Sequence, residues 1–491
     1  MKKIMALLLT LLAVIPLFVG CSNNTNNPAN TKSGETAAET DPYDDGVPDD
    51  LDYEGRVFTI GAPWPDNWGM EMYDRTEQSG DTINDAIYNR NRSLEKRFNI
   101  TIEAIQLGET GSQASEFAKY VLNNEDIIDM IAVGYYQSGK PLIMEGYLLP
   151  WNDVPYINTE KSWWNNNIID SLSILGNSYL LVGDVNWFSM AETPVCYFNK
   201  TVAGDNPQIV GDLYQTVKNQ EWTFNKLYTI AKDITKDLNG DNKFDTNDRY
   251  GCIQNTIIGV TGFVYAANYH TVIVTDEGPQ LQFNTDKMVD IISWLVDLCR
   301  SDNISYTETF DFTEDSKGIP MFFNDQALFY FDILMHAETF RQYEREFGII
   351  PYPKYDEEQE QYTSYCNQWG LACGLPSTST NHERTGAILE AMCALSAKNI
   401  VPQYYDRVLK GRYTRDYESE DMLDLIFSNV IYDFGISFCT DLSYIPAKTF
   451  VERNNKNVAS WFKSQEKKLE KNYQELFDYV AEIKNGGGEE A

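Results

Sequence analysis

The sequence predicts an α/β protein with more than one domain, mainly because of the order of its first elements. Residues 57–61 and 100–104 have the apolar patterns of two short strands. Between them Asp81 or Thr82 can cap a helix that carries apolar residues on one face, namely Ile83, Ile87, Leu94 and Phe98. A strand, a helix and a strand in this order predict a parallel sheet. The 491 residues are too many for one core, so we expect two or three domains.

The first 21 residues have the pattern of a secretory signal. Lys2 and Lys3 precede an uncharged apolar run, and Gly20-Cys21 resembles a bacterial lipobox. This resemblance implies cleavage before Cys21, acylation of Cys21 and an extracytoplasmic protein anchored to the cell membrane by palmitate or a similar chain. An ordinary signal peptide with a chance cysteine is the alternative. Residues 22–52 have few large apolar side chains and are predicted to form a disordered tether.

The charge of the chain narrows the choice of partners. The full chain carries a net charge of −34, and removal of Lys2 and Lys3 leaves 37 basic against 73 acidic residues, or −36. Such a surface repels nucleic acid, so no nucleic-acid partner is expected. A monomer is expected.

Cysteine and histidine usage argues against disulfides and zinc. Seven cysteines follow Cys21, and their odd number and apolar neighbours predict buried free thiols, although Cys366 and Cys373 are able to pair. The three histidines are not at ligand spacing, which disfavours zinc and histidine-base chemistry.

Residues 237–248 have the spacing of a calcium-binding loop. Oxygen side chains stand at positions 1, 3, 5, 9 and 12, and a backbone carbonyl is available at position 7; these residues are Asp237, Asn239, Asp241, Asp245, Asp248 and, for the carbonyl, Lys243. Position 6 is Asn242 where glycine is usual, and Asp248 is shorter than the usual glutamate. The pattern continues into a strand, which predicts a structural Ca²⁺ site and no sensor function. A solvated turn rich in Asn and Asp is the alternative.

No catalytic motif accompanies this loop. Gly134 to Lys140 imitates a phosphate-binding loop, but Pro141 replaces the hydroxyl residue that such a loop needs. No nucleophile elbow or metalloprotease motif is present. A pair of carboxylates, as in glycosidases, is defined by separation in space, so the sequence leaves it open.

Three stretches give the chain a resemblance to family 1 extracellular solute-binding proteins, the receptor lipoproteins of ABC importers in Gram-positive bacteria. They are residues 80–91, residues 221–227 leading into 237–251, and residues 347–355. The resemblance implies a two-lobed periplasmic-binding-protein-like fold of type II, with a ligand cleft between hinged lobes. It also implies a sugar or oligosaccharide ligand and an ABC permease as partner.

The resemblance also implies how the chain is divided. The first lobe is expected to hold residues 53–183 and 371–424, and the second lobe residues 184–370 and 425–485, with a flexible tail at 486–491. Three segments are expected to cross between the lobes and act as the hinge, namely 184–193, 364–370 and one near Tyr432.

Sugars have apolar faces and hydroxyl rims, so their receptors need flat aromatic rings and planar polar groups. The stacking candidates are Trp64 and Trp68 in the loop after the first strand and Trp187 and Trp369 in the expected crossings. The candidate hydroxyl partners are Asp184, Glu192, Asp332 and Asn367. Loop or core packing is the alternative for the tryptophans, and helix capping for the acids. Trp222, Trp294 and Trp461 are expected in the core, and Trp163 and Trp164 are undecided.

Three functions fit these observations. The first is a non-catalytic sugar receptor of an importer. The second is a surface enzyme that degrades glycans, and the third is an adhesive or signalling lipoprotein without a transporter. The sequence leaves the identity of the solute open, and peptide, polyamine or organic-acid ligands fit the same fold.

Overall fold

The computed structural model describes residues 41–486 except 67, 110, 135, 276–277, 309–316, 341, 344, 368, 410–416 and 439–440. The predicted signal peptide, Cys21, most of the predicted tether and residues 487–491 therefore lie outside the described residues. The chain separates into residues 1–42 and a body from Tyr43 onward, and all that follows concerns this body. No helix among the described residues combines the length and the apolar character needed to cross a membrane.

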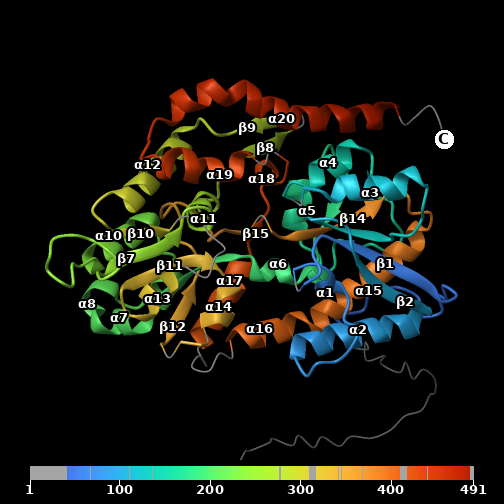
Figure 1. Cartoon of the computed structure of the whole chain (residues 1–491), viewed down its shortest axis with the longest axis horizontal. Helices are drawn as coiled ribbons and strands as arrows, with labels where there is room; N and C mark the ends of the chain where they lie inside the picture. The colour runs from blue at the N-terminus through green and yellow to red at the C-terminus, as the bar shows by residue number, and fades with distance from the viewer. Residues whose placement is uncertain are drawn as a thin grey trace, which may run out of the picture. The chain divides into compact units, whose positions relative to one another are not determined.

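The body contains two mixed sheets, which Figure 1 shows on its two sides. In the first sheet the strand order is β2-β1-β3-β14-β4, with β5 paired to β14, and β1 runs parallel to β2 and β3 while β14 is antiparallel to β3. Its strands are β1 (Arg56–Ala62), β2 (Ile100–Gln106), β3 (Met130–Gly134), β4 (Leu148–Leu149), β5 (Leu180–Leu181) and β14 (Leu371–Pro376). Its helices are α1 (Met70–Tyr73), α2 (Thr82–Phe98), α3 (Gln113–Leu122), α4 (Gly139–Met144), α5 (Asn166–Leu172) and α15 (His382–Asn399).

The predicted strand-helix-strand start is confirmed. The Asp81 side chain accepts hydrogen bonds from the backbone N–H groups of Ile83 and Asn84, and α2 then runs to Phe98. Asn99, with a φ of 50°, ends the helix in the left-handed conformation that asparagine tolerates. The chain then enters β2, which pairs with β1 over its whole length.

The second sheet has the order β10-β7-β11-β6-β12, with β6 antiparallel to β11 and β12. Its strands are β6 (Pro194–Asn199), β7 (Tyr250–Asn255), β10 (Ser305–Glu308), β11 (Ala327–Ile333) and β12 (Phe347–Ile350). The helices between them are α7 (Lys200–Asp205), α8 (Pro207–Val210), α9 (Leu213–Lys218), α10 (Phe224–Ile234), α11 (Ile258–Ala266), α12 (Asp286–Arg300), α13 (Gly318–Phe323) and α14 (His336–Phe340), and a hairpin is formed by β8 (Val272–Thr275) and β9 (Gly278–Leu281).

The remaining elements connect the sheets or follow them. They are η1 (Asp184–Asn186), α6 (Phe188–Ala191), β13 (Ser364–Tyr365), α16 (Val401–Leu409), α17 (Tyr417–Phe427), β15 (Val430–Ile431), α18 (Phe434–Phe438), α19 (Asp441–Tyr444), the π-helix η2 (Ile445–Val451) and α20 (Val458–Gly486).

The folded body begins earlier than expected, because part of the predicted tether is anchored. Arg97 in α2 donates hydrogen bonds to the Asp45 carboxylate at 2.6 and 3.1 Å and to the Val47 carbonyl. Val47 is buried, and the Lys398 ammonium lies over the Tyr43 ring. An ion pair and a buried side chain thus hold residues 43–47 on the body.

Two expected boundaries also differ. Residues 417–424 are expected in the first lobe, but α17 packs on β12 of the second sheet, where the Ser419 hydroxyl accepts a hydrogen bond from the Ile349 N–H. The C-terminal α20 is expected in the second lobe, yet it contacts α4 beside the first sheet as well as β9 and α12 beside the second. Figure 1 shows α20 passing along the top of the view above both sets of elements.

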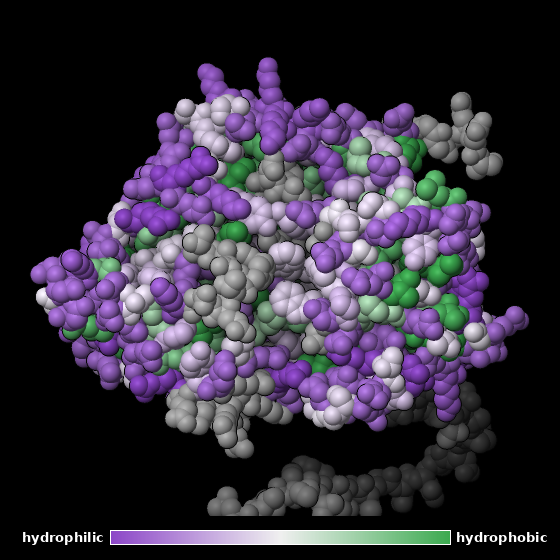
Figure 2. All heavy atoms as spheres, in the orientation of Figure 1, coloured by the Kyte–Doolittle hydropathy of each residue, from purple (hydrophilic) through white to green (hydrophobic). Residues whose placement is uncertain are grey.

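Most of the viewed face carries hydrophilic residues, as Figure 2 shows, in keeping with the acidic composition. The six cysteines that the structure describes are buried free thiols, as predicted, and Cys366 and Cys373 are both among them.

Candidate functional site

Three segments connect the two sheets, and they coincide with the expected crossings. Residues 184–193 lead from β5 into β6, and residues 364–370 lead from β13 into β14. The third segment contains β15, which pairs in parallel with β13. Most of the candidate residues lie on or beside these connections.

Three partly exposed tryptophans gather here. The ring centroids of Trp64 and Trp369 are 6.0 Å apart at an interplanar angle of 56°, and Trp68 lies 5.4 Å from Phe188 of α6. The loop that carries Trp64 folds back tightly, since Met70 N–H donates to the Trp64 carbonyl at 2.7 Å. A Cβ at Gly69 would lie 2.1 Å from that carbonyl oxygen, so this turn requires glycine. The structure thus brings aromatic rings from the first loop to the crossings.

Trp187 has a different environment from the one expected. Only 4% of it is exposed, and it packs between Phe188 and Tyr404 with centroid distances of 5.6 Å to each. Since both neighbours are aromatic and the residue is buried, Trp187 is a poorer stacking platform than Trp64, Trp68 or Trp369. Its indole Nε1 is buried without a hydrogen-bond partner among the described residues.

Glu192 and Asn367 bond to each other across two crossings. The Asn367 side-chain amide donates to Glu192 Oε2 at 3.0 Å, and the Asn367 N–H donates to the Glu192 carbonyl at 3.1 Å. Both residues are buried. Burial raises the pKa of Glu192 to about 7, although the Asn367 bond favours the ionised form. The predicted hydroxyl partners are therefore engaged with one another.

Asp332 lies at the end of β11 with its carboxylate largely satisfied. It accepts hydrogen bonds from the Tyr330 hydroxyl at 3.1 Å and from the Ile333 N–H at 2.8 Å, and His336 Nδ1 lies 3.1 Å away. Burial lowers the pKa of His336, but the charges of Asp332 and Glu192 outweigh it and the net shift is upward. His336, four residues after Asp332 on the first turn of α14, is a neighbour that sequence reasoning missed.

Asp184 differs from the other acids because its carboxylate forms no hydrogen bond with any residue that the structure describes. Its backbone N–H donates to the Trp163 carbonyl at 2.9 Å, which fixes the start of η1. Burial raises the pKa of its carboxyl to about 7. A carboxylate at a crossing without a protein hydrogen-bond donor can accept hydrogen bonds from a solute.

Comparison with known proteins gives matches at the level of structure. No protein-family model and no curated protein sequence matches the chain. Among solved structures, the GacH receptor of Streptomyces glaucescens, solved with and without acarbose, is 12% identical with a TM-score of 0.52 over 85% of this chain and 99% of that one. A cyclo/maltodextrin-binding protein complexed with maltotetraose is 12% identical with a TM-score of 0.53 over 88% and 97% of the two chains. UgpB from Mycobacterium tuberculosis, in complex with glycerophosphocholine, is 13% identical with a TM-score of 0.51 over 80% and 95%.

The fold is that of a two-lobed, type II periplasmic binding protein. The first sheet is the centre of one lobe and the second sheet the centre of the other, and the three connections are the crossings between the lobes.

The other tryptophans have structural roles. The two undecided residues, Trp163 and Trp164, donate their indole N–H groups to the carboxylate of Glu390 at 3.0 and 2.9 Å. The residues expected in the core pack there: Trp222 is fully buried, Trp294 stacks on Phe224 and Trp461 packs on Phe283.

The predicted calcium loop lies between α10 and β7 of the second lobe, so the helix-loop-strand order is confirmed. Hydrogen bonds between Lys236 and Arg249 close its base, and Asn242 at position 6 has a φ of 61°. The acidic side chains accept bonds from the loop's own backbone: Asp237 from Gly240 and Asn242, and Asp248 from Leu238 and Asp245. These bonds hold the pKa of Asp248 below its usual value.

The loop side chains do not converge on one point. No group of three or more His, Cys, Asp or Glu residues in the described part of the chain is arranged to hold a metal ion. A carboxylate has lone pairs enough to accept a backbone hydrogen bond and to bind a cation, so these bonds do not decide the matter and the site stays a prediction.

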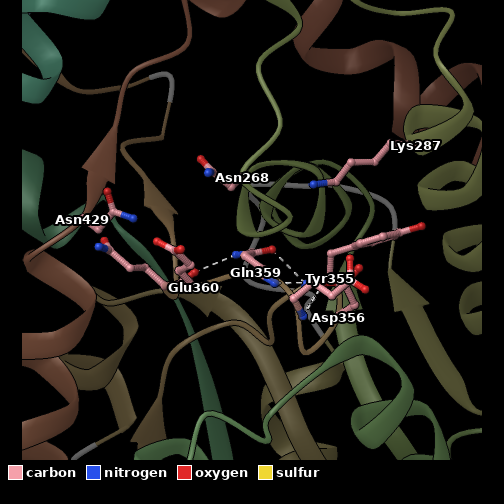
Figure 3. A pocket seen from close by; sticks show the side chains of 9 residues that line it. Asn268, Lys287, Tyr355, Asp356, Gln359, Glu360 and Asn429 are labelled. Atoms are coloured by element: carbon pink, nitrogen blue, oxygen red, sulfur yellow. Dashed lines mark hydrogen bonds between the residues drawn. The ribbon is translucent and has the colours of Figure 1, made fainter.

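A separate pocket of about 660 Å³ lies in the second lobe beside the third crossing (Figure 3). Its floor is held by Gln359, which accepts a bond from Tyr355 N–H and donates to the Ala266 carbonyl. The Lys287 ammonium lies 5.0 Å above the Tyr355 ring. None of the candidate solute-binding residues lines this pocket.

Proposed function

We propose that this protein is the solute-binding receptor of an ABC importer, and that it binds a sugar or oligosaccharide between its lobes and releases it unchanged. The observation that carries the proposal is the group of partly exposed tryptophans, Trp64, Trp68 and Trp369, at the crossings of a type II fold. Flat aromatic faces suit the apolar faces of sugar rings. The GacH receptor and the cyclo/maltodextrin-binding protein, which share the fold, were solved with acarbose and with maltotetraose.

The rest of the proposal concerns the cellular setting. The sequence of residues 1–21 supports an extracytoplasmic receptor anchored to the membrane through a lipid on Cys21, which delivers its solute to a permease. The spacing of residues 237–248 supports a structural Ca²⁺ ion in the second lobe.

Hydrolysis of glycans is the competing function. A glycosidase needs two carboxyl groups on opposite sides of the bond to be cleaved. Glu192 is tied to Asn367, and Asp332 accepts two hydrogen bonds and lies beside His336. These contacts count against Glu192 and Asp332 as a catalytic pair.

A glycan panel tests the proposal. Purified mature protein is titrated with maltotetraose, other oligosaccharides and glycerophosphocholine, with tryptophan fluorescence and calorimetry as readouts, and reducing ends are measured after long incubation. We expect saturable binding of at least one glycan without new reducing ends. Trp369→Ala is expected to weaken that binding several-fold, because an aromatic contact contributes about 0.5–1.5 kcal/mol.

Trp369→Phe is the matched control, since it keeps an aromatic face and should keep most of the affinity. Growth of reducing ends with wild-type protein would establish the enzyme instead. Equal affinities of Trp369→Ala and wild type would remove Trp369 from the site.

A further inference from the structure

Glu192 and Asn367 connect the first two crossings, next to a contact of the Cys366 thiol with the Ser189 carbonyl at 3.6 Å. One residue lies in 184–193 and the other in 364–370, and they share a backbone and a side-chain hydrogen bond, at 3.1 and 3.0 Å. Glu192 is fully buried and 2% of Asn367 is exposed, so water does not compete for these bonds. Movement of one crossing is thereby coupled to the other.

Asn367 also determines where Trp369 lies. The Gly370 N–H donates to the Asn367 carbonyl at 3.0 Å, and this backbone bond closes a turn that contains Trp369. Trp369 projects from this turn toward Trp64, 6.0 Å away. A shift of Asn367 therefore moves the tryptophan that the proposed function assigns to sugar stacking.

The bond that holds Asn367 depends on the ionisation of Glu192. Its Oε2 accepts from Asn367, and an amide donates a stronger hydrogen bond to a carboxylate than to a neutral acid. Its Oε1 is buried without a hydrogen-bond partner among the described residues. Burial, and less so Asp332, raise the pKa of Glu192 to about 7, while Asn367 and His336 lower it. The titratable groups facing Glu192 from the surrounding elements are Asp332, His336, Tyr365, Cys366 and Tyr432.

We propose that Glu192 is a positioning residue: through Asn367 it fixes the turn that carries Trp369, and the loss of its negative charge loosens this turn. Glu192, which the sequence predicts to touch the solute, thus acts through Asn367. This inference rests on the proposed function only for its consequence on binding, since the coupling to Trp369 exists without a ligand.

The test reads Trp369 directly. Protein labelled with 5-fluorotryptophan gives one ¹⁹F resonance per tryptophan, and Trp369→Phe assigns the one of interest. In ligand-free wild type we expect this resonance to titrate with a midpoint at about 7. Glu192→Gln, which cannot ionise, should abolish the titration. Persistence of the titration in Glu192→Gln would overturn the proposal.

A second acid with a raised pKa provides the matched control. Asp184 also has a pKa of about 7 but makes no bond to Asn367, so Asp184→Asn should leave the Trp369 titration in place. His336→Gln should retain the titration with a higher midpoint, because His336 lowers the pKa of Glu192. Loss of the titration in Asp184→Asn would show that Asp184, and not Glu192, causes it, and would contradict the proposal.

A variant on the other side of the contact covers the case in which Glu192→Gln does not fold. Asn367→Ala removes the donor, so the Trp369 resonance should move at every pH and stop titrating; an unchanged, titrating resonance contradicts the proposal. Calorimetry with maltotetraose then tests the consequence, an affinity weaker by about threefold or more at pH 6 than at pH 8 in wild type only. Absence of maltotetraose binding would count against the proposed ligand, whereas the ligand-free titration decides the role of Glu192.

Discussion

Acids with a raised pKa are the most unusual side chains of this protein. Asp184, Glu192 and Glu390 each have a pKa raised to about 7, mainly by burial. The Glu390 carboxylate has two indole donors and the Glu192 carboxylate one amide donor, whereas the Asp184 carboxylate has no hydrogen-bond partner among the described residues. A fold that withdraws an acid from water with few or no protein donors loses stability, which is common at functional sites and rare elsewhere.

Asp184→Asn therefore is expected to stabilise the protein. An acid with a raised pKa binds more protons in the folded than in the unfolded state. The contribution of Asp184 to the free energy of unfolding is therefore intact below about pH 4 and falls as pH rises toward 7. We expect the variant to melt about 1–3 °C above wild type at pH 8 and together with it at pH 4, measured by calorimetry.

Asn is nearly isosteric with Asp, so packing is preserved and the comparison isolates the charge. A variant that melts below wild type at pH 8 would show that the Asp184 carboxylate has a stabilising partner. If Asp184 also binds solute, the same variant gains stability and loses affinity.

At the scale of single elements, the loop 237–248 gives the clearest prediction. With excess Ca²⁺ the melting temperature of the wild type should rise, since a ligand at about 100 times its Kd stabilises by about 2.7 kcal/mol. Asp237→Asn should lose this increment because Asp237 is the first oxygen ligand of the predicted set. Mg²⁺ at equal ionic strength is the control for screening, and an identical rise with both ions, or none with calcium, would remove the calcium site.

Elements were predictable where the signals are local. The cap at Asp81 and the apolar face of α2 depend on residues that are close together in the sequence, and the predicted helix matches the observed one. The crossings were placed well because the resemblance supplied their order. The contacts of the candidate residues were not predictable. Glu192 and Asn367 are 175 positions apart, and only the tertiary fold brings them together. For the same reason Trp187 was expected in the cleft and is buried instead.

At the scale of the whole molecule, α20 is the element that departs most from the expected division into lobes. Its amphipathic pattern was visible in the sequence, but the pattern does not say which lobe its apolar face covers. Lys484 of α20 donates to the Leu175 carbonyl of the first lobe at 2.7 Å, and Trp461 packs on Phe283 of the second lobe at 5.4 Å. The helix therefore joins both lobes on the side of the molecule opposite α16 in Figure 1.

A substitution in the middle of α20 should consequently affect both lobes together. Phe477 is 3% exposed and its ring lies 5.6 Å from that of Phe434 in α18. Phe477→Ala is expected to cost about 3–5 kcal/mol and to lower the melting temperature in a single transition. Hydrogen exchange should rise in α4 and in β9 alike, because both elements contact α20.

Lys471→Ala, at an exposed position of the same helix, is the control and should change stability by less than about 0.5 kcal/mol. Faster exchange confined to one lobe would mean that α20 belongs to that lobe alone and does not join the two.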